Sequence, residues 1–246
     1  MNTPRIYWLE TRNECLRTLR MPSFALPALA FPLVFYLMFA VLLNRGSAQA
    51  GTYLLATYGV FGVMGAALFG FGVQVAVERG NGLLRLKRAL PLPAGAYLAA
   101  KTGMALLFGL LISLGLLALA VTLAGVRLAP QQALLLVLIN LLGTVPFAAL
   151  GLYIGTVTTG HSAPAVVNLV FLPMAFLSGL WMPLTLLPGV LTQLAPLWPA
   201  YHLSQLTLKV VGQDAGQPIG LHLGVLALVT AVFMLLARAR LAGAEA

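Results

Sequence analysis

Long apolar segments dominate the sequence and restrict the folds that are open to it. A transmembrane helix needs about 20 consecutive apolar residues, and six segments meet or approach that length: about 22–43, 53–77, 102–124, 133–155, 164–181 and 219–237. The chain of 246 residues is 61% hydrophobic and only 8% charged, so its apolar surface exceeds what one soluble core could bury. We therefore predict an all-α polytopic membrane protein with six transmembrane helices in a single domain, 1–246.

The positive charges predict how these helices are oriented. The formal net charge is +9, but the cations lie at the ends of apolar segments and are not interleaved with exposed aromatics, which argues against nucleic-acid binding. A cytoplasmic N-terminus would leave only Arg45, Arg127 and Lys209 outside. Because cytoplasmic loops are enriched in Lys and Arg, we predict that both termini are cytoplasmic. Eleven cations then lie inside: Arg5, Arg12, Arg17, Arg20, Arg79, Arg85, Lys87, Arg88, Lys101, Arg238 and Arg240.

Residues 1–21 are too charged to span a membrane, yet they have a helical pattern. One helical side is apolar except for Arg12, whose stem can lie along it while its charge reaches water. We predict an interfacial helix that leads into the first span. The alternative is a positively charged tail that only sets orientation. The apolar side consists of Trp8, Leu9, Cys15, Leu16 and Leu19.

The segment 78–101 is the one place where charge gathers between long apolar segments. It holds five of the fourteen Lys and Arg residues against one acid, Glu78. Its centre, Gly82 to Leu90, has apolar residues at helical spacing, and prolines follow directly. We predict a short amphipathic helix on the cytoplasmic face. Two partners fit such a helix: anionic membrane lipid or another protein.

The segment 182–218 is apolar enough to enter a bilayer but is interrupted by prolines. Each proline removes a backbone donor, and lipid cannot satisfy the carbonyls that are freed. We predict a re-entrant or interfacial helical hairpin, with a simple extracellular loop as the alternative. The interrupting residues are Pro183, Pro188, Pro196 and Pro199.

The polar content of the predicted spans is neutral and indicates helix packing. No carboxylate lies at mid-membrane depth, where it would mark a proton or ion path, so an ion-coupled carrier is disfavoured. Small residues in the second span predict close helix contacts. They are Gly59, Gly62, Gly65, Ala66, Gly70 and Gly72.

Two patterns in the sequence resemble enzyme motifs, but neither has the sequence context that such a motif needs. Gly95 to Thr102 resembles a phosphate-binding loop, but its second glycine is replaced by Ala100 and no strand precedes it; we expect Lys101 to lie at the lipid headgroups. Ser178 could serve a membrane-embedded serine protease, with His202 or His222 as its base. Neither histidine is expected deep in a span, and three isolated histidines do not predict a metal site.

Two motifs resemble the permease subunits of ABC-2 type exporters, especially the drug-exporter branch. In the central loop, Glu78, Arg79, Gly82, Leu84 and Pro91 match the family pattern in register, whereas Gly80 and Leu83 replace its usual Glu and Thr. The second motif precedes the last span and comprises Ser178, Gly179, Pro183, Leu187, Pro188, Pro199, Tyr201, His202 and Leu203.

This resemblance implies a non-catalytic permease of a bacterial inner membrane that moves an amphiphilic, drug-like or lipid-like cargo outward. It implies a dimer of permeases, most simply a homodimer, bound to two ABC ATPase subunits. ATP and Mg²⁺ would sit on those partners, with no cofactor in this chain. The residues implied to couple to the ATPase are Glu78, Arg79, Gly82, Leu84, Leu86 and Pro91.

Overall fold

The computed structural model describes residues 3–44, 46–89, 92–93 and 95–243, and within them the chain is helical with no strand. The predicted all-α class is confirmed. The α-helices are α1 (Thr3–Leu19), α2 (Pro22–Tyr36), α3 (Ala48–Ala67), α4 (Gln74–Gly80), α5 (Leu83–Ala89), α6 (Ala96–Thr122), α7 (Pro130–Val157), α8 (Ala163–Leu177), α9 (Gly189–Leu194), α10 (Pro199–Val210) and α11 (Ile219–Gly243). Two π-helical stretches, η1 (Leu37–Leu43) and η2 (Leu68–Val73), and two 3₁₀ turns, η3 (Leu184–Leu186) and η4 (Ala195–Leu197), complete them.

Five helical runs within the described residues are long and apolar enough to cross a membrane: Pro22–Leu43, Ala48–Gly80, Ala96–Thr122, Pro130–Val157 and Ile219–Arg240. They correspond to five of the six predicted spans, so this is a multi-pass membrane protein. The remaining predicted span, 164–181, is the 15-residue helix α8. At 1.5 Å per residue α8 is about 22 Å long, which is less than the bilayer's hydrocarbon thickness of about 30 Å.

A helix-ending turn explains why α8 stops earlier than predicted. Gly179 has φ +73°, a conformation that glycine adopts without steric cost. Its N–H donates to the Phe176 carbonyl, and the N–H of Leu180 donates to the Ala175 carbonyl, both at 3.1 Å. This pair of bonds is the Schellman arrangement that closes a helix C-terminus. Hydropathy alone cannot locate it, because the residues beyond the turn are still apolar.

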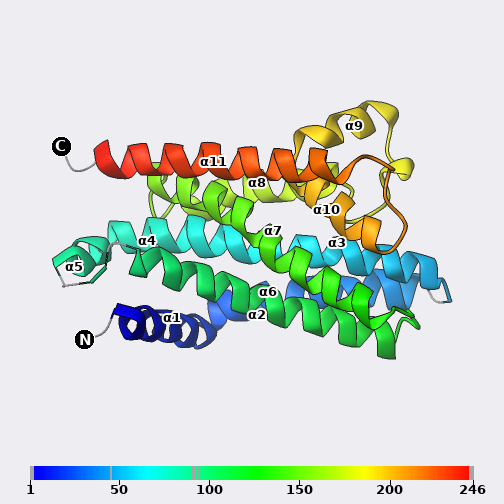
Figure 1. Cartoon of the computed structure of the whole chain (residues 1–246), viewed down its shortest axis with the longest axis horizontal. Helices are drawn as coiled ribbons and strands as arrows, with labels where there is room; N and C mark the ends of the chain where they lie inside the picture. Colours follow the sequence, from blue (N-terminus) through cyan, green and yellow to red (C-terminus); the bar gives the residue numbers. More distant parts are fainter. Residues whose placement is uncertain (1–2, 45, 90–91, 94, 244–246) are drawn as a thin grey trace.

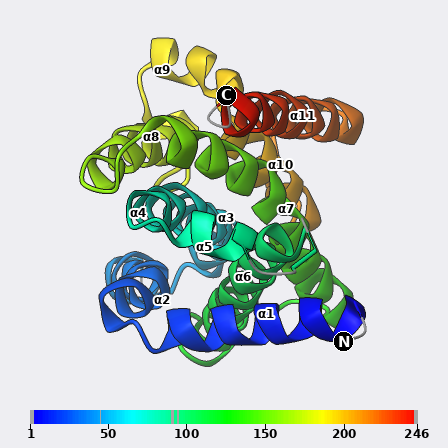
Figure 2. The ribbon, with the colours of Figure 1, turned by 90° about the vertical axis from the view of Figure 1, so that its left-hand side faces the viewer.

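The long helices form an elongated bundle, and α1 lies across its axis (Figures 1 and 2). The start of α1, the helix α5 and the last turns of α11 lie at one end, which we call the terminal end (left in Figure 1). The helices α9 and α10 lie toward the opposite, distal end. Both ends of the chain therefore share one side of the bundle with the charged central segment.

The run formed by α3, η2 and α4 lies at the centre of the bundle and is its most buried part. The predicted close contacts of its small residues are found within the chain. A Cβ atom on Gly62 would lie 2.5 Å from Ile112 Cγ2, and one on Gly59 would lie 2.4 Å from Asn140 Nδ2. These contacts let α6 and α7 pack closely on α3, whereas α2 and α11 are mostly exposed.

The proline-interrupted segment folds into short helices, as predicted. Pro183 and Pro188 immediately precede η3 and α9, and Pro199 is the first residue of α10. At the start of a helix a proline costs no hydrogen bond and its φ is already suitable. The helix α9 has no buried residue, whereas α10 packs against α3, α7 and α11.

Candidate functional site

A buried ionic cluster joins three helices near the terminal end. Lys101, on α6, has an exposed fraction of 0%. Its Nζ lies 2.7 Å from Glu14 Oε1, 2.8 Å from Glu78 Oε1 and 2.9 Å from Gln74 Oε1. The expectation that Lys101 lies at the headgroups is therefore wrong, because two carboxylates from α1 and α4 hold it inside the protein. The members of this ionic cluster are Glu14, Arg17, Gln74, Glu78, Tyr97 and Lys101.

The cluster is balanced in charge, and both of its carboxylates are hydrogen-bonded. Glu78 has an exposed fraction of 5%; its Oε2 accepts a bond of 2.6 Å from the Tyr97 hydroxyl, and its Oε1 is also paired with Arg17. Arg17 lies 2.7 Å from Glu14 as well. Two cations thus face two anions, which is the condition for keeping charges buried. Loss of one member would leave a buried charge without its partner.

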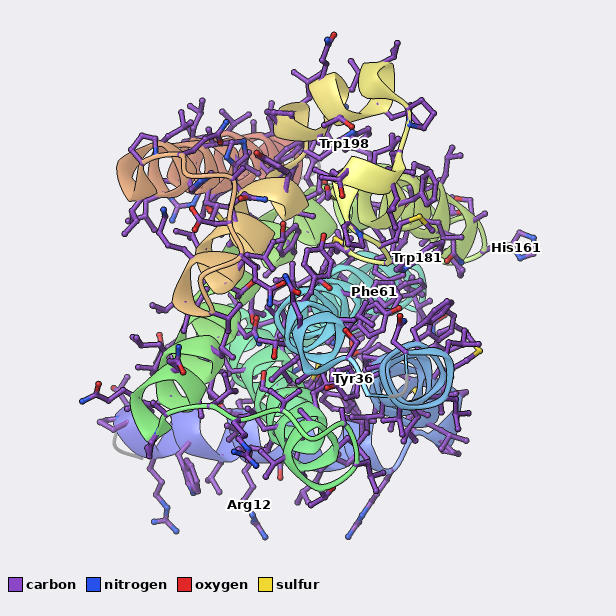
Figure 3. The ribbon with its side chains drawn as sticks, turned by 90° about the vertical axis from the view of Figure 1, so that its right-hand side faces the viewer. Arg12, Tyr36, Phe61, His161, Trp181 and Trp198 are labelled. Carbon is purple, nitrogen blue, oxygen red and sulfur yellow. The ribbon has the colours of Figure 1, made fainter. Side chains whose placement is uncertain are left out.

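The helix α1 packs on α6 through its polar side. Glu14 and Thr18 are buried, and glycines on α6 and just before it leave room for α1. A Cβ atom on Gly103 would lie 2.4 Å from Thr11 Cγ2, and one on Gly95 would lie 2.9 Å from the Tyr7 hydroxyl. The predicted apolar side is therefore only partly in contact with the bundle: Cys15 packs against the core, whereas Trp8 is 67% exposed. Arg12 points outward on the same side (Figure 3).

The segment 79–89, which includes α5, is attached to its surroundings at two points. Lys87 Nζ of α5 lies 2.7 Å from Glu10 Oε2 of α1. Near the end of α4, Arg79 donates to the carbonyls of Thr156 and Thr158, the latter at 2.7 Å. A cation on the last carbonyls also suits the negative end of the helix dipole. The segment 79–89 is thus tied to both α1 and α7.

The other predicted coupling residues differ in exposure. Gly82 has φ +73° and forms the turn between α4 and α5. Leu84 is half-buried, whereas Leu86 is 65% exposed and available to a partner. Pro91 lies outside the described residues.

A cavity with many aromatic side chains in its wall lies between α2, α3 and α8. We call it the aromatic cavity. Its volume is about 480 Å³, and no charged residue lines it. Phe61 is central: its ring centroid lies 5.0 Å from that of Phe171 and 6.1 Å from that of Trp181. Figure 3 shows Phe61 and Trp181 close together on neighbouring elements. The polar lining includes the side chains of Ser23 and Asn168.

Comparison with known proteins identifies the family. Residues 6–211 match the family model described as ABC-2 type transporter. The chain belongs to the ABC-2 type transporter family. It is also similar to "Putative transport permease YvfS" of Bacillus subtilis (strain 168), with 29% identity over 230 residues, which are 92% of each chain. The protein is thus a transmembrane permease of an ABC transporter, and its membership implies an ABC ATPase partner.

In this ABC-2 permease, the second motif shapes the region between α8 and α11. Gly179 ends α8, and its carbonyl accepts a bond of 2.8 Å from the Tyr53 hydroxyl. The Tyr201 hydroxyl donates to Gln217 Oε1 at 3.4 Å. The side chain of His202 contacts His222 and the carbonyl of Pro196. These motif residues hold short helices in place.

The protease alternative finds no support in the positions of its residues. Ser178 Oγ is buried and has no hydrogen-bond partner among the described residues. His202 and His222 are instead engaged with each other, with their Nδ1 atoms 3.0 Å apart. The near-match to a phosphate-binding loop, Gly95 to Thr102, forms the first turns of α6, so its backbone amides are not arranged around a phosphate.

Sequence reasoning missed the ionic cluster and the aromatic cavity. A signal for the cluster was present, because Gln74 and Glu78 are four residues apart and share one helical face. Their partners Glu14 and Lys101, however, come from distant segments. For the cavity, Phe31 and Phe35 have the same helical spacing, but nothing in the sequence places them opposite Phe171.

Proposed function

We propose that this ABC-2 permease exports an amphiphilic, drug-like or lipid-like molecule outward across a bacterial cell membrane. Two identical copies would work with two ATPase subunits, which hold the ATP and Mg²⁺, while this chain itself binds no cofactor. The observation that carries the proposal is the aromatic cavity.

The lining of the aromatic cavity favours a cargo that is largely apolar. Its volume of about 480 Å³ falls within the roughly 300–1,000 Å³ of sites for small molecules. Aromatic side chains, among them Phe61 and Trp181, form much of its wall. An uncharged wall disfavours a bare ion, because burying an unpaired charge is costly.

The ionic cluster supports a route for coupling between the ATPase and this cavity. An ATPase that moves α5 would also move α1 through Lys87 and Glu10. It would move α4 directly, and Gln74 and Glu78 of α4 hold Lys101 of α6. The helices α3 and α4 form one continuous helical run, Ala48–Gly80, and Phe61 lies in α3. Glu78 would act as a positioning residue, since its buried carboxylate is occupied by groups of this chain.

The flanks of the aromatic cavity support a dimeric arrangement. Phe31 of α2 is 54% exposed, and Leu169 and Leu172 of α8 are 75% and 43% exposed. A second copy, or lipid, would cover these apolar side chains. The exposed side of α1, with Trp8 and Arg12, would rest on membrane lipid.

The test is transport by the permease co-expressed with its ATPase and reconstituted in liposomes, with a fluorescent amphiphile as cargo. We expect Phe61→Ala and Trp181→Leu to reduce transport and cargo-stimulated ATP hydrolysis, because both change the cavity wall. The matched control is Leu228→Ala, which changes a residue of α11 that is 63% exposed. Equal transport by the wild type and the three variants would refute the proposal that the cavity binds cargo.

A further inference from the structure

Two buried histidines meet where α10 packs against α11. Their Nδ1 atoms are 3.0 Å apart, and His202 Nε2 lies 2.8 Å from the carbonyl oxygen of Pro196. The exposed fractions of His202 and His222 are 2% and 0%. This histidine pair, His202 and His222, therefore links η4, α10 and α11.

The hydrogen bonds define where the protons are. A carbonyl oxygen only accepts, so His202 Nε2 carries a hydrogen, and a neutral imidazole has only one. His202 Nδ1 is then the acceptor, and the Nδ1–H of His222 donates to it. His222 Nε2 is left as a bare acceptor, and it has no partner among the described residues. The geometry fits two neutral rings in two different tautomers.

We propose that the histidine pair is a proton-binding site that holds α10 against α11 while both rings are neutral and releases it when a proton binds. A proton on His202 Nδ1 would bring two N–H groups face to face at 3.0 Å. A proton on His222 Nε2 would create a buried cation whose new N–H has no acceptor. Either state is costly in a dry interior, and it is relieved if the rings separate and reach water.

The described groups around the pair offer no unpaired anion to stabilise its protonated form. The nearby charged residues are Lys209 and Asp214, whose Nζ and Oδ2 lie 2.6 Å apart. The bond from Lys209 keeps the pKa of Asp214 below its ordinary value, so this carboxylate stays ionised but already has its cation. Tyr201 packs edge-to-face against both rings and is neutral near physiological pH. The packed helices α3, α7 and α8 contain no charged residue, and the cations of α11, Arg238 and Arg240, lie at its other end.

The experiment measures thermal unfolding of the purified full chain in detergent at about pH 7.5 and about pH 5.0, on either side of the ordinary histidine value of about 6.5. The double variant His202→Gln/His222→Asn keeps amide groups near the bonded ring nitrogens but removes both imidazole rings. We expect the wild-type Tm to fall more between these pH values than the Tm of the double variant. The matched control is His161→Gln, which removes the remaining, exposed histidine and should behave like the wild type.

A distance measurement separates release of α10 from general acid damage. Spin labels at Leu197→Cys and Leu228→Cys, in a Cys15→Ser background, report on η4 and α11 at positions that are 75% and 63% exposed. A shift to longer distances at acid pH, present with the histidine pair and absent in the double variant, is the expected result. An equal loss of Tm in wild type and double variant, or an unchanged distance distribution in the wild type, would overturn the proposal.

Discussion

Lys101 has its charge inside the protein because two helices, α1 and α4, supply its partners. Glu14 and Glu78 bring negative charge from α1 and α4, and Gln74 adds a neutral acceptor. A buried ion pair is weak evidence for stability in itself, but removing one partner leaves the other charge uncompensated. The role of Lys101 therefore depends on its partners being present.

We predict that Lys101→Met destabilises the permease by about 3–5 kcal/mol, because Glu14 and Glu78 would then share one cation. Denaturant unfolding of the purified chain measures this change. Adding Glu78→Gln should recover part of the loss, since it removes one of the two carboxylate charges. The control is Arg12→Gln, an exposed cation on α1 that should have little effect; an equally small effect of Lys101→Met would contradict the structure of the cluster.

For single residues, the sequence indicated which segments carry notable side chains but did not indicate where those side chains lie in the fold. The match of Glu78, Arg79 and Gly82 to a family motif drew attention to the segment that contains Glu78. It did not show that Glu78 points into the bundle, because Glu14 and Lys101 are distant from it in sequence and only the packed fold brings them together. Lys101 was expected at the headgroups for the same reason: its place at the start of an apolar segment does not reveal a buried partner.

Among the elements, α8 shows how a local turn overrides hydropathy. We predict that Gly179→Ala lowers stability by about 1–2 kcal/mol, the cost of a left-handed conformation for a residue with a Cβ atom. The new Cβ would also lie 2.8 Å from Leu184 Cγ. Gly189→Ala is the matched control, since a Cβ there meets nothing within 4 Å and the site is the first residue of α9. The comparison is made by Tm, and equal Tm values for the two variants would contradict this account.

In the proposed coupling route α5 meets the ATPase, and Leu86 of α5 is 65% exposed. We predict that Leu86→Asp abolishes ATP-driven transport while the Tm of the permease stays unchanged, because a few apolar contacts usually carry most of an interface's binding energy. Lys87→Gln should be milder, since it removes only a partly exposed ion pair. Transport in liposomes and pull-down of the ATPase are the measurements. Normal transport by Leu86→Asp would show that α5 serves another partner, such as lipid.

Hydropathy and proline spacing predicted most helices because each depends only on a short stretch of the chain. Apolar length located five long helices, and prolines marked the starts of α9 and α10. What they could not predict was which face of α1 packs inward. Trp8 and Leu16 of its apolar side are exposed, whereas Glu14 is buried against Lys101 of α6.

For the whole molecule, orientation in the membrane follows from joining the charge pattern to the fold. The start of α1, the helix α5 and the last turns of α11 share one end of the bundle (Figure 1). The loop after α7 belongs to this end as well, because Arg79 of α4 bonds to Thr158 there. Eleven of the fourteen Lys and Arg residues were assigned to this side from the sequence. Because cytoplasmic loops are enriched in Lys and Arg, we predict that this basic side faces the cytoplasm.

We therefore predict that single cysteines at Leu86 and His161 are protected in sealed cells from a membrane-impermeant thiol reagent, whereas one at Gln49 is labelled. All variants are made in a Cys15→Ser background, so that only the introduced thiol reacts. Gln49 is exposed and lines a polar cavity of about 410 Å³ at the distal end, together with Arg127 and Gln213, and water there keeps the thiol reactive. Permeabilised cells provide the control, in which Leu86→Cys and His161→Cys should become labelled because both sites are exposed. Labelling of Leu86→Cys in sealed cells, with protection of Gln49→Cys, would place the terminal end outside and would remove α5 from the reach of any cytoplasmic ATPase.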